Sequence, residues 1–150
     1  MRRIFLILLF ILLSISLVYA DNGLVNIKSP YTVKKTMDRL ETALKEKGMT
    51  IFARINHSEG AKKVGIDLPA TELIIFGNPK VGSPLMNCNR TVGIDLPQKT
   101  LVWEDENGQV WLSYNAPRYL AKRHDLNECM QVIEKIEKAL SNFSKAATMP

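Results

Sequence analysis

The sequence predicts an α+β domain in which helices pack on a mostly antiparallel sheet. Three observations support this class: short strand-like apolar segments, two amphipathic helical segments, and one hairpin signal near the C-terminal third. The segments occur in the order βαββ(α)ββα, without the regular βαβ alternation that a parallel sheet requires. The strand-like segments lie at residues 24–27, 50–55, 72–76, 100–104 and 109–114.

Residues 32–47 form the clearest predicted helix. Thr32 is a good N-cap, and Val33, Met37, Leu40 and Leu44 follow at helical spacing. Gly48 stands where a C-terminal cap belongs, so we expect the helix to end just before it.

The segment after this helix alternates in polarity and is predicted to be a strand. Alternation places Ile51, Ala53 and Ile55 on one face, and Phe52 and Arg54 on the other. His57 continues the parity of the apolar face, so we expect its side chain to point towards the core. Residues 58–65 are expected to form a loop or one helical turn.

The segment 72–76 (ELIIF) is apolar enough for a buried strand, and Gly77–Pro79 ends it. A short helix around residues 83–87 is expected inside a longer loop. Asn107–Gly108 is a strong hairpin signal. A two-residue turn there pairs Trp103 with Leu112, which places Trp103 and Trp111 on opposite faces of the hairpin.

The C-terminal segment has helical spacing. Pro117 can begin a short helix, and a final helix follows with a tail that we expect to fray after Phe143. The apolar residues of the final helix are Leu126, Met130, Ile133, Ile136, Leu140 and Phe143.

The first twenty residues have the pattern of a secretory signal peptide. Arg2 and Arg3 precede an apolar run from Ile4 to Val18, and Val18-Tyr19-Ala20 fits a cleavage site. A retained membrane anchor is the alternative, but a spanning helix needs about 20 apolar residues. We therefore expect a signal peptide at 1–20, one domain at 21–150, no membrane span after cleavage, and export to the periplasm or cell envelope.

Charge gives little support for nucleic-acid binding. The chain has 20 basic and 15 acidic residues, and the leader carries two of the basic ones. The remaining charge of +3 is spread among mixed signs rather than gathered into a basic patch. We expect no nucleic-acid partner.

Two cysteines, Cys88 and Cys129, follow the leader. An exported chain with two cysteines favours one disulfide, which closes a loop of about 40 residues. Two reduced thiols are the alternative, because the sequence alone does not place the two Cα atoms.

The chain carries no HExxH, CxxC, P-loop, GxSxG or GxGxxG motif. His57, with Glu59 two residues on, is the candidate catalytic group, and a strand-end histidine bonded to backbone is the alternative. Candidate ligand-binding residues are Asn78 and Lys80, in a turn that can bind anions, together with Met86 and His124. We expect no metal and no cofactor.

Four blocks of the chain resemble the family known as domain of unknown function 302. They are FARINHSEGAKKVG, TELIIFGNPKVGSPLM, GIDLPQKTLVWEDENGQVWLSYN and YLAKRHDL, between about Gly23 and Leu126. The resemblance implies a compact α+β domain, often dimeric, in bacterial proteins that are sometimes exported. It implies no reaction and no site residue, and it covers neither the cysteine pair nor the helix beyond Leu126.

The hexapeptide VGIDLP occurs twice, at 64–69 and 92–97. Both copies precede a predicted strand by a few residues. We interpret both copies as the same structural segment leading into a strand, with a buried Ile and Leu and a terminating Pro. A duplicated ligand-binding loop is the alternative.

The pattern favours a non-enzymatic exported module, expected to be a homodimer, that binds a small molecule or an envelope protein. A thiol- or histidine-dependent redox protein or enzyme, using Cys88 and Cys129 or His57, is the alternative hypothesis.

Overall fold

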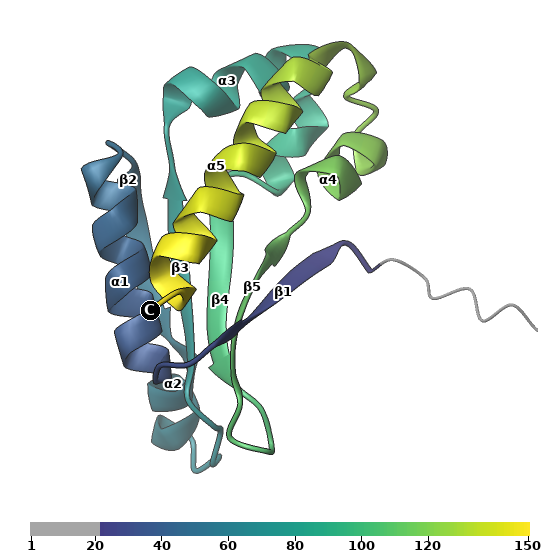
Figure 1. Ribbon diagram of the computed structural model, residues 1–150. Helices are drawn as coiled ribbons and strands as arrows, with labels where there is room; N and C mark the ends of the chain where they lie inside the picture. Colours follow the sequence, from purple (N-terminus) through teal and green to yellow (C-terminus); the bar gives the residue numbers. More distant parts are fainter. Residues whose placement is uncertain (1–21) are drawn as a thin grey trace, which may run out of the picture.

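A computed structural model describes residues 22–150, which form one five-stranded sheet with helices packed on it (Figure 1). The predicted signal peptide, residues 1–20, lies outside the described residues. The elements are β1 (Leu24–Ser29), α1 (Val33–Glu46), β2 (Thr50–Asn56), α2 (His57–Lys63), β3 (Thr71–Gly77), α3 (Pro79–Cys88), the 3₁₀ turn η1 (Arg90–Ile94), β4 (Gln98–Glu104), β5 (Val110–Asn115), α4 (Pro117–Arg123), η2 (Asn127–Cys129) and α5 (Met130–Thr148).

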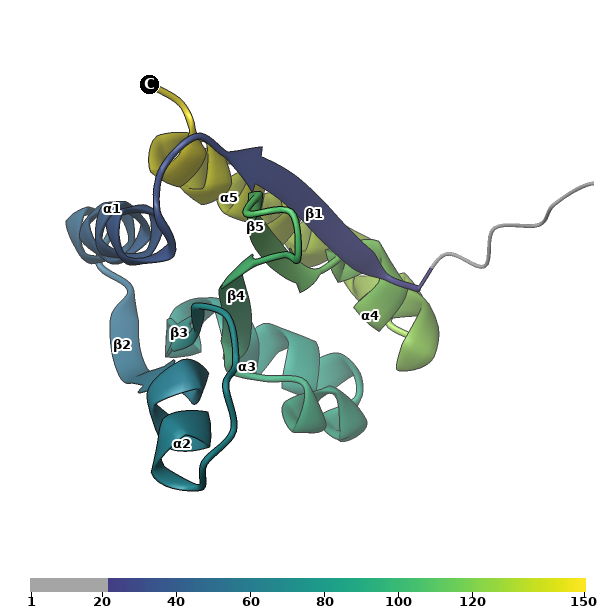
Figure 2. The same cartoon turned by 90° about the horizontal axis from the view of Figure 1, so that it is seen from below.

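The sheet is antiparallel throughout, in the order β1-β5-β4-β3-β2. Helices α1 and α5 cover one face, as the view from below shows (Figure 2). This arrangement confirms the predicted α+β class, with β1 and β2 as the two edge strands. No helix within residues 22–150 is long and apolar enough to cross a membrane.

The core lies between the two long helices and the sheet. Met37, Leu40 and Leu44 of α1 are buried, as their helical spacing predicts. The Thr32 side chain accepts a hydrogen bond from the Lys35 backbone N–H at 3.2 Å, which caps the helix as expected. The sheet contributes the fully buried side chains of Ile74, Val102 and Leu112.

The C-terminal end of α5 is ordered, so the predicted fraying after Phe143 is wrong. Ala147 and Thr148 are buried. Arg39 of α1 donates hydrogen bonds to the carbonyl oxygens of Ala146, Ala147 and Met149. A helix end leaves carbonyl groups without partners, and the guanidinium supplies them from the neighbouring helix.

The predicted parity of β2 fails at one residue. The pairing between β2 and β3 shifts between Ile51 and Ala53, so Phe52 forms a β-bulge. The extra residue reverses which face each later side chain occupies. Arg54 therefore turns to the side of α1, and Ile55 lies 39% exposed on the opposite face of the sheet.

Arg54 is the centre of an ion-pair network between the sheet and α1. Its guanidinium lies 2.7 Å from a carboxylate oxygen of Asp38, 3.1 Å from Glu41 and 2.7 Å from Glu72. Hydrogen bonds from Lys34 and then Arg54 lower the pKa of Asp38. The pKa of Glu41 is lowered by Lys45 first and by Arg54 as well. The ionised carboxylates are thus the favoured forms.

The loop of the β4–β5 hairpin is longer than predicted, and both tryptophans lie on one face of the hairpin. Trp103 pairs directly with Trp111, and their rings stack with centroids 6.5 Å apart. The reason is Asp105, whose carboxylate accepts hydrogen bonds from the backbone N–H groups of Asn107 and Gln109 and from Trp111 Nε1. This side chain stabilises a five-residue loop in place of the two-residue turn.

The two VGIDLP copies do precede strands β3 and β4, but they are not buried alike. Ile66 and Leu68 of the first copy are exposed, and Ile94 of the second is 74% exposed. Only the second copy contributes a fully buried residue, Val92. The expected burial of Ile and Leu in both copies is therefore wrong, because the first copy links α2 to β3 at the surface.

Candidate functional site

An apolar cleft of about 410 Å³ opens at the end of the sheet where β2, β3 and β4 meet α3, η1 and α5. One side is formed by Met49, which immediately precedes β2, by Phe52 near the start of β2, and by Phe76 of β3. Helix α5 closes the other side with Ile136, Ala139, Leu140 and Phe143. Pockets of 300–1,000 Å³ with predominantly apolar walls are typical of small-molecule sites.

The wall formed by α3 owes its position to its N-terminus. The Asn78 side chain caps the helix by accepting a hydrogen bond from the Lys80 backbone N–H at 2.9 Å, and Pro79 occupies the first helical position. The helix then presents Val81, Gly82 and Met86 to the cleft. It runs from Pro79 to Cys88, longer than the predicted residues 83–87.

Three glycines line the cleft: Gly77 at the end of β3, Gly82 in α3 and Gly93 in η1. A Cβ on Gly82 would lie 3.7 Å from Leu96, and one on Gly93 would lie 3.6 Å from the Met86 sulfur. A Cβ on Gly77 would lie between Pro97 and Phe52, at 3.4 and 3.5 Å. These are ordinary van der Waals distances, so a Cβ at each of these lining positions fits without displacing its neighbours.

Two of the predicted ligand-binding residues, Asn78 and Met86, line this cleft. Lys80 is exposed and lies outside the lining. Lys135 of α5, which no sequence pattern singled out, is the charged group among the described residues that line the cleft. Lys135 is exposed, and it reaches the lining because α5 packs beside α3.

His57 does not point to the core. The Phe52 bulge reverses the parity on which that expectation rests. The strand then ends at Asn56, the N-cap of α2, and His57 is the exposed first residue of this helix. Asn56 caps this helix by accepting a hydrogen bond from the Glu59 backbone N–H at 2.9 Å. Neither the His57 ring nor the Glu59 carboxylate bonds to another described side chain, so the two do not form a dyad here.

His124 belongs to a buried polar network separate from the cleft. Its ring is 6% exposed, with Nδ1 2.9 Å from the Thr91 hydroxyl and Nε2 2.6 Å from an Asp95 carboxylate oxygen. Asn89 donates a hydrogen bond to the His124 carbonyl oxygen at 2.8 Å. The network fastens η1 to the C-terminal end of α4.

Cys88 and Cys129 lie at disulfide distance, with Cα atoms 6.5 Å apart. This bond joins the last residue of α3 to the last residue of η2, immediately before α5. It therefore ties together two walls of the cleft. Within residues 22–150, no group of three His, Cys, Asp or Glu side chains is placed to hold a metal ion.

The fold and the cleft define a class: a single α+β domain with helices on one face of an antiparallel sheet and an apolar cavity at one end. The family model for the domain of unknown function DUF302 matches residues 25–143. The chain belongs to this family, as its sequence blocks suggested. The match also includes most of α5, which the recognised blocks had left outside.

A solved structure confirms the fold. The uncharacterized conserved protein DUF302 from Bacillus stearothermophilus superposes with a TM-score of 0.76 at 22% identity, over 84% of this chain and 98% of that one. Among curated proteins, the fluoride-specific ion channels FluC 1 of Brucella suis and FluC 2 of Brucella melitensis are each 50% identical over 106 residues. That is 71% of this chain but only 42% and 39% of the two relatives.

Proposed function

We propose that the protein is an exported, non-enzymatic binding module of the bacterial periplasm or cell envelope, and that a small apolar molecule occupies the cleft. The leader-like residues 1–20 support export of a single domain, residues 21–150. The observation that carries the binding role is the cleft, about 410 Å³ of space with walls from α3, α5 and the ends of three strands. Pockets of this size and polarity hold drug-sized ligands.

A thiol- or histidine-dependent reaction has less support. His57 is exposed without a partner among the described side chains, and both cysteines lie at bonding distance from each other. His124 contacts Asp95 and Thr91, yet its ring is buried in the network that anchors η1. A catalytic base has to reach the proton that it removes, and this ring has little access.

Gly82 gives a direct test of the cleft. The neutral apolar probe N-phenyl-1-naphthylamine should bind the wild-type protein saturably, with increased fluorescence. Gly82→Leu places a larger side chain at the cleft. It is expected to weaken binding of the probe about tenfold or more, the equivalent of about 1.4 kcal/mol. Fluorescence titration measures the probe affinity of the wild type and of the variant.

Gly82→Ala is the matched control, because it makes the same helix-favouring change without filling the cleft. Both variants should keep or raise the melting temperature, since Gly inside a helix costs about 1 kcal/mol relative to Ala. Equal probe affinity for Gly82→Leu and Gly82→Ala, or no saturable binding by the wild type, would refute the cleft as the binding site.

A second candidate function is association with a membrane protein of the envelope. The Brucella relatives are named as fluoride-specific ion channels, and the matched segment is about two fifths of their length. An ion channel is therefore a candidate partner for the present chain. Fluoride itself does not suit the apolar cleft, because a small ion loses its hydration there without gaining polar partners.

We also propose that the protein forms a homodimer through the face of the sheet opposite α1 and α5. Ile55, Leu73, Leu101 and Trp103 lie on that face by the strand register, and all are at least partly exposed. Large exposed apolar patches usually mark contacts. Sedimentation should give the dimer mass for the wild type and the monomer mass for Leu101→Glu, while Lys122→Glu, an exposed position on α4 away from this face, serves as the control.

A further inference from the structure

We propose that the ligand of the cleft is an amphipathic monocarboxylate: an apolar body, of the size of a medium-length acyl chain, with one carboxylate bound by Lys135. This inference rests on the proposed function, because it names the ligand class for the same cleft. It follows from three features of the described lining: its mainly apolar walls, its single cationic side chain, and the amide of Asn78.

The walls of the cleft are mainly apolar. Its walls are made by Phe52, Phe76, Val81, Leu96 and Phe143, which offer no hydrogen-bond partner. A polar group placed among them without a partner costs several kcal/mol relative to water. The body of the ligand that lies against these side chains is therefore a hydrocarbon or an aromatic ring.

The charge at the cleft is positive and unpaired. Lys135 is exposed, lines the cleft, and forms no ion pair with any described side chain. The residues three and four positions away on α5 are Gln131, Val132, Lys138 and Ala139, so no acid lies at helix-pairing distance. In contrast, Lys34 and Lys45 on α1 pair with Asp38 and Glu41 at 2.7 and 2.6 Å.

The sign of this charge selects the head group of the ligand. No carboxylate belongs to the described lining, so an alkylammonium ion would find only like charge at the mouth. Asn78 adds a donor: its Oδ1 already accepts the Lys80 N–H, which leaves the Nδ2 group to donate. A carboxylate only accepts hydrogen bonds, so it matches both the ammonium of Lys135 and the amide of Asn78.

The experiment is displacement of N-phenyl-1-naphthylamine by decanoate, 1-decanol and decylammonium, each kept below its aggregation concentration. The three competitors share one apolar body and differ in their head groups. We expect decanoate to displace the probe most effectively. Lys135→Gln should weaken the binding of decanoate about fivefold, a modest effect because the ammonium is exposed to water. The affinities of this variant for decanol and for the probe should stay within about twofold of the wild-type values.

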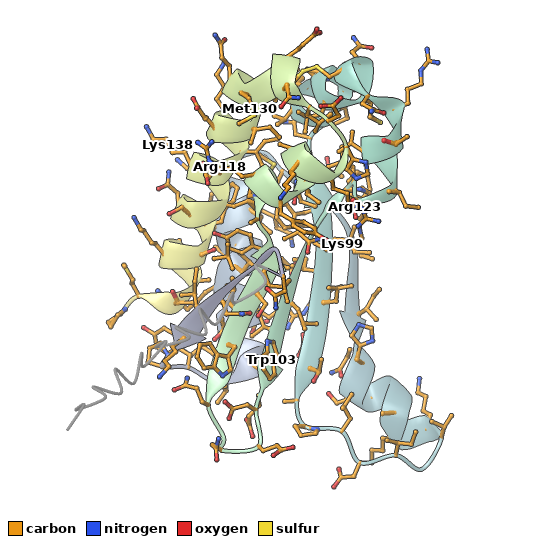
Figure 3. All side chains as sticks on the ribbon, turned by 90° about the vertical axis from the view of Figure 1, so that its right-hand side faces the viewer. Lys99, Trp103, Arg118, Arg123, Met130 and Lys138 are labelled. Carbon is orange, nitrogen blue, oxygen red and sulfur yellow. A yellow bond between two sulfur atoms is a disulfide. The ribbon has the colours of Figure 1, made fainter. Side chains whose placement is uncertain are left out.

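Lys138→Gln is the matched control, since Lys138 lies one turn along α5 and points outward, away from the sheet (Figure 3). It should leave decanoate binding unchanged, and Lys135→Arg should retain it. Equal loss in the two glutamine variants, or stronger binding of decanol or decylammonium, would overturn the carboxylate proposal while probe binding still supports the cleft. If the wild type binds no probe, the proposed function fails first.

Discussion

Replacing Cys88 with serine and Cys129 with alanine is expected to lower the free energy of unfolding by about 4 kcal/mol. The two cysteines are 41 residues apart, and a cross-link over such a loop restricts the unfolded chain by about that amount in the chain-entropy model. Alanine suits position 129 because Cys129 is buried, whereas Cys88 is exposed. Urea unfolding of the oxidised wild type and the double variant measures the difference.

Reductant provides the control for this experiment. The wild type should lose the same stability when its cysteines are reduced, and the double variant should not respond to reductant. Because the bond joins α3 to the segment before α5, the reduced protein should also bind N-phenyl-1-naphthylamine more weakly. A wild type whose stability is the same with and without reductant would contradict a structural bond between these residues.

Replacing Arg54 with methionine is expected to cost about 3 kcal/mol at neutral pH, because it leaves the largely buried carboxylate of Glu72 without its cation. Glu72 is the most buried of the three acids, with 12% of its side chain exposed, and it would keep no ion-pair partner among the described residues. Arg118→Met is the matched control: its pairs with Glu134 and Glu137 are exposed, so its loss should cost less than about 1 kcal/mol. Equal costs for the two variants would refute the network.

The pH dependence of stability gives the Arg54 network a second readout. The folded pKa values of Asp38 and Glu41 lie below the ordinary values of 3.8 and 4.5. Their contribution is therefore complete above these values and is lost as the pH falls below them. Arg54→Met should flatten this acid dependence without abolishing it, because Lys34 and Lys45 still pair with the two acids.

Local patterns predicted most of the fold, and the errors have specific causes. The cap at Thr32 and the apolar spacing through Leu44 are contained in one segment, so α1 was predictable. The side of the sheet on which His57 lies was not predictable, because one bulged residue, Phe52, reverses the parity that alternation assumes. The tryptophan register failed for a similar reason, since the Asp105 carboxylate stabilises a longer turn than Asn107–Gly108 suggests.

The cleft could be predicted only in part. Asn78 and Met86 were singled out from their local segments, and both line it. Lys135 lies on α5, about fifty residues further along the chain, and its sequence neighbours resemble those of any solvent-exposed helix face. A site assembled from six separate elements leaves no local pattern, so its ligand class emerges only from packing.

The bulge at Phe52 also affects how the protein behaves at high concentration. A flat edge strand offers unpaired backbone groups to which another chain can add, which is a common route to aggregation. β2 is such an edge, but its irregular pairing at Ile51–Ala53 and the Arg54 guanidinium within it make it a poor template for strand addition. The residue that reverses the strand's parity thus also protects the folded domain from self-association along this edge.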